Sequence, residues 1–234
     1  MESVFITGNS RGIGLALTRH YLSDGFKVAG CSRQGCQERH VNLTDMRCDL
    51  AQPDQIEAAL QKLFASQQQL DLVVLNAALL GDIAEVQNTP LAHAKQVMDV
   101  NLWANKVILD WFLSRGICIK QIVFMSTGAS VVGYRGLTAY SLSKSALNML
   151  CQLYTHEFPD THLAALAPGI VDTAMQEKLC DVDVKRFPAM QSLKDARGTP
   201  MMPTPAKAAE QLVWAFTRLK SFPSGSFVDL RELH

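Results

Sequence analysis

The feature that most constrains the fold of this chain is a glycine-rich turn between a short apolar run and a helix-like stretch. The apolar run covers residues 4–7, the turn TGNSRGIG covers 7–14, and the following stretch has the apolar spacing of a helix that ends at Gly25. Backbone N–H groups in such a turn can approach a pyrophosphate, and the helix N-terminus adds a partial positive charge. The glycine spacing departs from the G-x-G-x-x-G fingerprint, so on its own it is equally compatible with a plain tight loop.

Strand-like and helix-like segments alternate along most of the chain. This alternation predicts an α/β fold: one Rossmann domain over residues 1–234, with a doubly wound parallel sheet of about seven strands flanked by helices. The expected strands lie at residues 4–7, 27–31, 46–48, 72–75, 121–125, 163–166 and 226–230. After the first helix, the expected helices lie at 53–68, in two pieces within 91–115, at 138–158 and at 206–219. Residues 34–45 are short and polar, so we expect the crossover helix there to be lost or reduced to a turn.

Composition removes several classes of function. Lys plus Arg and Asp plus Glu both number 22, so no net charge attracts nucleic acid or an anionic membrane. The longest apolar stretch, residues 70–80, is too short to span a bilayer, and the N-terminus lacks a signal sequence, so we expect a cytoplasmic protein without a membrane partner. The six cysteines form no CxxC pair, which argues against a metal site and a disulfide scaffold.

Five motifs occur in an order and spacing that resemble the short-chain dehydrogenases/reductases over nearly the whole chain. They are TGNSRGIG at 7–14, LNAA at 75–78, Asn101, YSLSK at 140–144 and PGIVDT at 168–173. The short second crossover, the Ser-Arg ending of the second strand and the C-terminal SGSFVDL look most like the sepiapterin reductase and benzil reductase group. The resemblance implies a Rossmann fold and hydride transfer with a nicotinamide cofactor.

Tyr140 and Lys144 are the expected acid and base. A tyrosine with a pKa near 10 is a poor proton donor at neutral pH unless a cation lowers that pKa, and Lys144 lies one helical turn away. The resemblance implies a third hydroxyl that holds the substrate oxygen; its position is Thr127, which we favour, with Ser126 as the alternative. Asn101 resembles the residue that anchors a water beside the lysine, although a lone Asn in a helix can simply bond backbone.

The end of the second strand favours NADP(H) as the cofactor. An acid there would bond the ribose of NAD, whereas this strand ends in Ser32 and Arg33, and Arg11 adds a second cation. The alternative is that both arginines are ordinary surface charges. The resemblance implies that the cofactor is held by the following residues: Gly8, Ser10, Arg11, Gly12, Ile13, Gly14, Arg33, Asp49, Leu50, Asn76, Ala77, Tyr140, Lys144, Pro168, Gly169, Val171 and Thr173.

Residues 172–203 break the strand-helix alternation, and we interpret them as a mobile flap that covers the substrate. Its candidate lining residues are Met175, Phe187, Met190 and Met201, which could equally be plain core. The expected activity is NADPH-dependent reduction of a small, partly apolar ketone, aldehyde or diketone, with Tyr140 as the proton donor. The alternatives are alcohol oxidation at the same site, and an NADP(H)-binding sensor or scaffold without turnover. The family resemblance implies a homodimer or homotetramer built on the two long helices.

Overall fold

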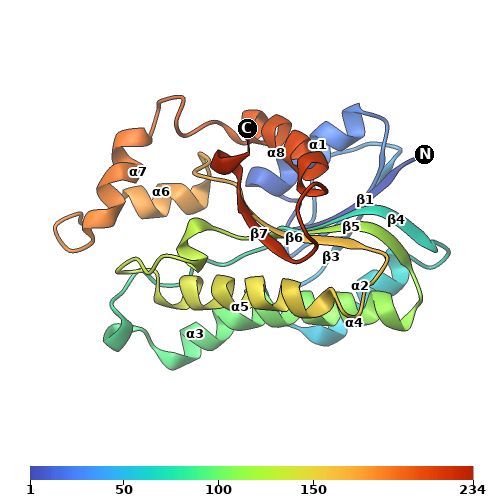
Figure 1. The fold of residues 1–234 in the computed structure, drawn as a ribbon, viewed down its shortest axis with the longest axis horizontal. Helices are drawn as coiled ribbons and strands as arrows, with labels where there is room; N and C mark the ends of the chain where they lie inside the picture. The colour runs from blue at the N-terminus through green and yellow to red at the C-terminus, as the bar shows by residue number, and fades with distance from the viewer. Residues whose placement is uncertain (234) are drawn as a thin grey trace.

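A parallel sheet of seven strands runs through the centre of the protein, and helices cover both of its faces (Figure 1). The computed structural model describes residues 1–233. The strand order is β3-β2-β1-β4-β5-β6-β7, and every neighbouring pair is parallel. The strands are β1 (Ser3–Thr7), β2 (Lys27–Ser32), β3 (Leu43–Arg47), β4 (Gln69–Leu75), β5 (Cys118–Met125), β6 (His162–Ala167) and β7 (Ser226–Asp229). The predicted doubly wound α/β fold is therefore confirmed; residue 234, at the end of the expected domain, lies outside the described residues.

The helices form one layer above the sheet and one below it in the view of Figure 1. The α-helices are α1 (Gly12–Ser23), α2 (Pro53–Leu63), α3 (Leu91–Met98), α4 (Ala104–Ser114), α5 (Thr138–Tyr154), α6 (Ala174–Cys180), α7 (Gln191–Ala196) and α8 (Pro205–Leu219). Helices α1 and α8 pack on one face through residues such as Leu17 and Phe216. Helices α2, α4 and α5 pack on the other through Ile56, Phe112 and Leu147. The inner strands are buried on both faces, as expected of a parallel sheet, whereas the edge strands β3 and β7 are partly exposed.

Some boundaries differ from the sequence prediction for physical reasons. Strand β3 begins at Leu43 rather than at 46, because it pairs with β2 from the Val28–Leu43 register onward. It is an edge strand with partly exposed side chains, so its hydrophobic signal is weak. The two helices expected within 91–115 form one continuous helical segment, since the π-turn η2 (Asp99–Trp103) joins α3 to α4. No helix links β2 to β3, as predicted.

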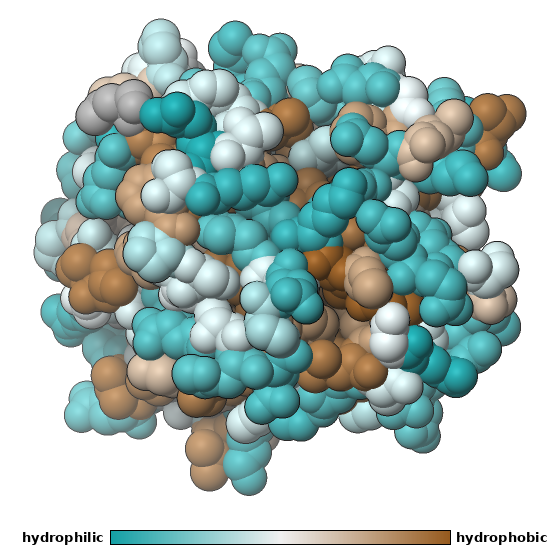
Figure 2. Space-filling model, turned by 45° about the vertical axis from the view of Figure 1, so that its right-hand side comes forward, coloured by the Kyte–Doolittle hydropathy of each residue, from teal (hydrophilic) through white to brown (hydrophobic). Residues whose placement is uncertain are grey.

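The surface carries mixed polarity. Figure 2 shows hydrophilic side chains over most of one face, with apolar ones in small groups, some of them in a recess near its centre. Within residues 1–233, no helix combines the length and the apolar character that crossing a bilayer requires. The flap, residues 172–203, holds α6, the 3-10 turn η4 (Pro188–Met190) and α7.

Candidate active site

The predicted site residues gather where the strands end at their carboxyl edge. After β1 the chain crosses to one face of the sheet, and after β4 it crosses to the other face. The carboxyl ends of these two neighbouring strands are therefore the topological switch point, where α/β sheets bind ligands. The glycine-rich turn follows β1 there. Gly8 and Gly12 have φ angles of +71° and +54°, which favour glycine, and a Cβ at Gly14 would lie 2.3 Å from the Gly8 carbonyl oxygen.

Asn76 fastens this turn to the end of β4. Its Nδ2 donates to the Thr7 carbonyl at 2.9 Å, and the N–H groups of Asn76 and Ala77 donate to Thr7 Oγ1 at 3.0 and 3.1 Å. Ala77 also touches the turn directly, since a Cβ on Gly8 would come within 2.9 Å of its Cα. Three hydrogen bonds and one close approach therefore join the TGNSRGIG and LNAA motifs where β1 and β4 end.

The turn faces the segment that follows β6. A Cβ on Gly12 would lie 3.4 Å from Thr173 Cγ2, so the glycine-rich turn and the PGIVDT run lie against each other; we call the region that these two segments border, at the carboxyl edge of the sheet, the cofactor cleft. Pro168, Gly169 and Val171 lead from β6 towards this region, and Thr173 caps the start of α6, where its hydroxyl accepts from the Gln176 N–H. Ser10 and Ile13 belong to the same turn, with Ile13 packed against the core of α1 and α8.

Three arginines lie near the carboxyl ends of β1, β2 and β3, which we call the outer end of the cofactor cleft. Arg11 precedes α1, Arg33 follows β2, and Arg47 ends β3 with its Cα in register with Ser32. All three are exposed, and none forms an ion pair with another residue of the described chain. Sequence reasoning missed Arg47, because only the pairing of β2 with β3 brings it beside Ser32.

Two buried polar atoms suit a bound nucleotide at this end. Ser32 Oγ and Asn9 Oδ1 have no hydrogen-bond partner within residues 1–233. The nearby carboxylate of Asp45 is already engaged, by Asn9 Nδ2 at 2.6 Å and the Cys36 N–H at 2.7 Å. Unpartnered hydroxyl and amide oxygens, three cations and a tight glycine turn make up a set of groups that fits an adenosine ribose carrying a phosphate.

Asp49 and Leu50 lie beyond the end of β3, on the same edge. The Asp49 carboxylate accepts from the Ala51 N–H at 3.1 Å, and its own N–H donates to the Gln55 side chain at 3.0 Å. Leu50 is 7% exposed and packs into the core beneath α2. The pair therefore has a backbone held by hydrogen bonds and one buried apolar side chain, and its contact with adenine stays a prediction.

Thr127 and Tyr140 lie close together. Thr127 follows β5 directly, and its hydroxyl lies near enough to the Tyr140 phenol on α5 to affect the pKa of that phenol. Burial raises the pKa of Tyr140 to about 12, and the Thr127 hydroxyl partly offsets this rise. Ser126 is 4% exposed and donates instead to Asn148 at 2.6 Å. Of the two candidates, Thr127 is the one beside Tyr140.

Lys144 lies beneath this pair and is almost fully buried. It is 1% exposed, its Nζ donates to the Met125 carbonyl at 2.6 Å, and it lies 6.0 Å from the centre of the Tyr140 ring. Burial lowers the pKa of Lys144 to about 7. In the protein without cofactor, desolvation dominates both groups: it raises the pKa of the phenol and lowers that of the lysine. The expected lowering of the Tyr140 pKa by Lys144 together with a cationic nicotinamide stays a prediction.

The Asn101 side chain forms hydrogen bonds to the segments around the site and has no surface exposed in the cofactor cleft. It lies in the π-turn η2, is 0% exposed, accepts from the Leu79 N–H at 2.7 Å and donates to the Leu79 carbonyl at 2.9 Å. It also donates to Ser143 Oγ at 2.9 Å, and Ser143 in turn donates to the Tyr140 carbonyl. The side chain therefore bonds backbone, which was the alternative interpretation from sequence, yet it connects to the Tyr140 helix.

The flap covers Tyr140 with apolar side chains. Met175, Phe187 and Met190 belong to one cluster with Tyr140 and Leu80. The expectation that Met201 lines this region is wrong: it is 73% exposed, whereas the adjacent Met202 is 4% exposed and packs in a separate cluster. Met202 is buried and Met201 is not, because the turn after α7 directs only one of the two methionines inward.

A charged clamp fixes the flap to two loops. Glu85, before the 3-10 turn η1 (Val86–Asn88), accepts from Arg186 Nε at 2.9 Å on the flap, and from Arg135 Nη2 at 3.0 Å on the loop before α5. Arg186 also reaches the second oxygen of Glu85 and stacks 5.0 Å from the Phe187 ring. Hydrogen bonds from Arg186 hold the pKa of the Glu85 carboxyl far below its usual range.

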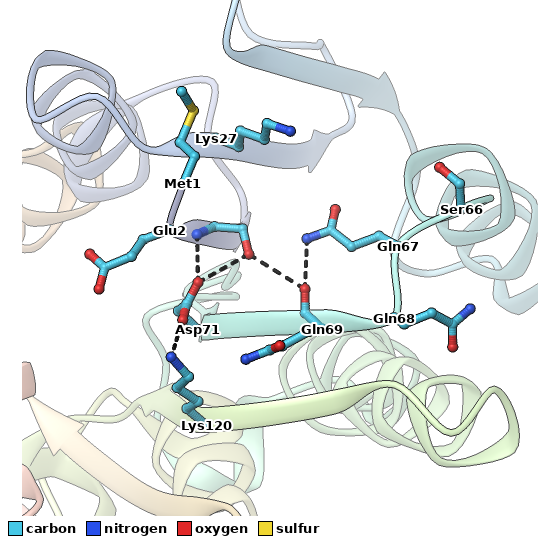
Figure 3. A pocket seen from close by; sticks show the side chains of 10 residues that line it. Met1, Glu2, Lys27, Ser66, Gln67, Gln68, Gln69, Asp71 and Lys120 are labelled. Carbon is cyan, nitrogen blue, oxygen red and sulfur yellow. Dashed lines mark hydrogen bonds and ion pairs between the residues drawn. The ribbon is translucent and has the colours of Figure 1, made fainter.

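A hollow of about 610 Å³ lies at the opposite edge of the sheet, where the strands begin (Figure 3). Its polar groups largely satisfy one another: Asp71 accepts from the Ser3 N–H at 2.8 Å and pairs with Lys120 at 2.7 Å. The side chains drawn there come from the starts of β1, β2, β4 and β5 and from the loop before β4. This hollow is separated from Tyr140 by the length of the sheet and has no part in the site.

Comparison with known proteins agrees with this geometry. Residues 2–182 match the model of the short chain dehydrogenase family. An uncharacterized oxidoreductase of Schizosaccharomyces pombe is 32% identical over 74% of this chain and 72% of its own length. A benzil reductase of Bacillus subtilis that forms (S)-benzoin is 26% identical over 99% of both chains. The solved structure of a short-chain dehydrogenase/reductase from Saccharomyces cerevisiae has a TM-score of 0.83 at 19% identity, covering 100% of this chain and 97% of its own, and bears on the fold alone.

Proposed function

The chain belongs to the short-chain dehydrogenase family, and from that membership we propose that it is an NADPH-dependent reductase of small, partly apolar ketones, aldehydes or diketones. The observation that carries the proposal is the hydroxyl pair of Thr127 and Tyr140 above a buried Lys144, at the switch point of the sheet. The overall change is addition of a hydride and a proton to a carbonyl, which leaves an alcohol and NADP⁺.

In this proposal, each side chain has one task at the carbonyl. NADPH, when bound, supplies the hydride to the carbonyl carbon. Tyr140 donates its phenolic proton to the carbonyl oxygen, and Thr127 donates a hydrogen bond to the same oxygen. Lys144 adjoins Tyr140 and is the nearby group that can return a proton to it, because a lysine with a pKa of about 7 exchanges protons readily at neutral pH.

The preference for NADPH over NADH rests on the arginines at the outer end of the cleft. Arg11, Arg33 and Arg47 would face the 2′-phosphate, and the unpartnered Ser32 hydroxyl would bond it. Asp45 already accepts one hydrogen bond on each carboxylate oxygen from within the protein, which makes it a weaker partner for a ribose 2′-hydroxyl than a free carboxylate would be. A phosphate dianion between guanidinium groups forms charge-assisted bonds worth about 1.5–3 kcal/mol each.

The substrate class follows from the flap. Met175, Phe187 and Met190 surround Tyr140 with apolar and aromatic surface, which favours a carbonyl attached to apolar groups. Among the relatives are enzymes described as benzil reductases, and benzil is a diketone of this kind. We therefore propose diketones with aromatic or alkyl substituents as the first substrates to test.

We further propose that two or four copies of the chain associate through α5. Leu142, Met149 and Leu153 are 61%, 52% and 56% exposed and recur along one side of that helix. Apolar side chains at this spacing suit a helix that packs against a partner. Sedimentation velocity of the wild type and of Met149→Glu tests this, and a monomeric wild type at micromolar concentration would contradict it.

The experiment that tests the activity is NADPH oxidation, followed by absorbance, with a panel of diketones, ketones and aldehydes. We expect turnover of benzil or a related diketone with NADPH, weaker turnover with NADH, and alcohol as the product. The same panel in reverse, with NADP⁺ and the corresponding alcohols, measures oxidation at the same site. A protein that binds NADPH and turns over nothing in either direction would favour a sensor or scaffold instead.

A further inference from the structure

A buried amide on α5 lies in the same row as the two expected catalytic side chains. Asn148 follows Lys144 by one helical turn and Tyr140 by two, so the three side chains face the same way. Asn148 is 8% exposed and faces the Thr127 turn, which we define as residues 126–130. A polar residue two turns into a helix usually points to solvent, so its burial here needs partners.

The partners are the two serines that flank Thr127. Asn148 Oδ1 accepts from Ser126 Oγ at 2.6 Å, and Asn148 Nδ2 donates to Ser130 Oγ at 2.8 Å. Ser130 Oγ then donates to the Thr127 carbonyl at 2.6 Å. One amide therefore holds the residue before Thr127 and, through a second hydroxyl, the carbonyl of Thr127 itself.

The same helix supplies two further bonds to this turn. Lys144 Nζ donates to the Met125 carbonyl at 2.6 Å, and Ser145 Oγ donates to the Ser130 carbonyl. The chain from residue 125 to residue 130 is thus bonded to α5 at both ends. Because α5 also carries Tyr140, the network sets the separation between the Thr127 hydroxyl and the phenol.

We propose that Asn148 is a positioning residue that holds Thr127 in register with Tyr140, acting through Ser126 and Ser130. The part of this inference that concerns turnover rests on the proposed reductase activity. The part that concerns the structure of the Thr127 turn does not depend on that activity. A displacement of about 1 Å at a reacting group can lower the rate by up to about a hundredfold, so a loosened turn has a kinetic cost beyond lost stability. A merely structural amide would lower stability alone.

The first test needs no substrate. Asn148→Leu removes both bonds while keeping a similar volume, and amide hydrogen exchange then reports on the turn, where the Ser130 N–H donates to the Thr127 carbonyl at 3.0 Å. We expect exchange of the Ser130 and Val131 amides to accelerate by tenfold or more. Gln121→Met is the matched control: this buried amide lies on β5, the strand that leads to the Thr127 turn, and it donates to the Phe216 carbonyl at 2.7 Å, away from the turn. Unchanged exchange at the turn in Asn148→Leu would overturn the proposal.

The second test is a double-mutant cycle with Thr127→Val. We expect Asn148→Leu to lower kcat by about tenfold in the wild type, with an unchanged dissociation constant for NADPH. In the Thr127→Val background it should lower kcat no further, while the thermal midpoint falls equally in both backgrounds. An equal tenfold loss of kcat in both backgrounds would show that Asn148 does not act through Thr127.

Two outcomes keep this inference separate from the proposed function. If the wild type reduces no carbonyl but the turn loosens in Asn148→Leu, the proposed reduction falls and the positioning role stands on the exchange data. If Asn148→Leu does not fold, Ser130→Ala replaces it, because it breaks only the link from Asn148 to the Thr127 carbonyl. That variant should show the same dependence on Thr127 with a smaller loss of kcat, and independence from Thr127 would again refute the proposal.

Discussion

Replacing Lys144 with methionine should make the cofactor-free protein more stable at low pH and remove part of its pH dependence. The folded protein lowers the pKa of Lys144 from 10.5 to about 7, whereas the unfolded chain keeps the ordinary value. Between these two values the unfolded state binds more protons than the folded state, so the free energy of unfolding rises with pH. Below pH 7 the folded protein bears the whole penalty of a buried ammonium group.

The magnitude follows from the shift. The difference between 10.5 and about 7, at roughly 1.4 kcal/mol per pH unit, amounts to an upper limit on the order of 5 kcal/mol. Lys144→Met also leaves the Met125 carbonyl without the donor it has at 2.6 Å, which costs about 1–3 kcal/mol. At pH 6 we therefore expect the variant to be more stable by up to about 2–4 kcal/mol. From pH 7 to 9 this advantage should shrink by nearly 1.4 kcal/mol per pH unit.

Urea unfolding of both proteins at pH 6, 7, 8 and 9, without cofactor, measures the difference. Subtracting the two curves removes the contributions of other titrating groups, such as the buried cysteines and tyrosines, which both proteins share. With a urea dependence of about 2–3 kcal/mol per molar, the difference between midpoints should change by about 1 M from pH 7 to 9. A difference that stays constant over this range would refute the claim that Lys144 titrates near neutral pH.

Three further outcomes are expected. Arg33→Asp should weaken NADPH binding at least tenfold and leave NADH binding unchanged or improved, since it reverses a charge at the expected 2′-phosphate; equal wild-type affinities for both cofactors would contradict the assignment. Tyr140→Phe should lower turnover by roughly 10² to 10⁴ with NADPH affinity intact, and near-normal turnover would mean that the proton comes from another group. Glu85→Gln should weaken the clamp to Arg186, raising the substrate KM and speeding proteolysis within the flap; no change in either would exclude a clamping role.

The fold was predictable from sequence because its signals are local. Each strand is a short apolar run, and the turn at Gly8 to Gly14 marks the first strand-to-helix connection. The errors occur where a long-range contact decides the structure. Strand β3 starts at Leu43 because of its pairing with Val28, and its half-exposed residues carry no strong pattern of their own. Arg47 becomes a candidate cofactor contact only through that same pairing.

The site shows the same division between local and non-local information. Tyr140 and Lys144 are recognisable because their four-residue spacing is a property of one helix, whereas their pKa values depend on what the folded chain packs around them. Because side chains alternate along a strand, the sequence predicts that Ser126 and Thr127 point to opposite sides. Nothing near Ser126 in the sequence, however, identifies its hydrogen-bond partner Asn148, which lies 22 positions away.

This difference explains why sequence could name the acid-base pair but not the pKa values of its members in the cofactor-free protein. Sequence reasoning considered the charges near the phenol and left out the desolvation of the two groups. In the folded chain both groups are desolvated, and desolvation acts on them in opposite directions: it raises the pKa of Tyr140 and lowers that of Lys144. A positive charge beside Tyr140 would lower the pKa of the phenol and of Lys144 alike, whereas water reaching both groups would raise the pKa of Lys144 and lower that of Tyr140. Met175 and Phe187 pack in one cluster with Tyr140. We therefore expect that exposing Tyr140 to water, by loosening this cluster, lowers the pKa of Tyr140.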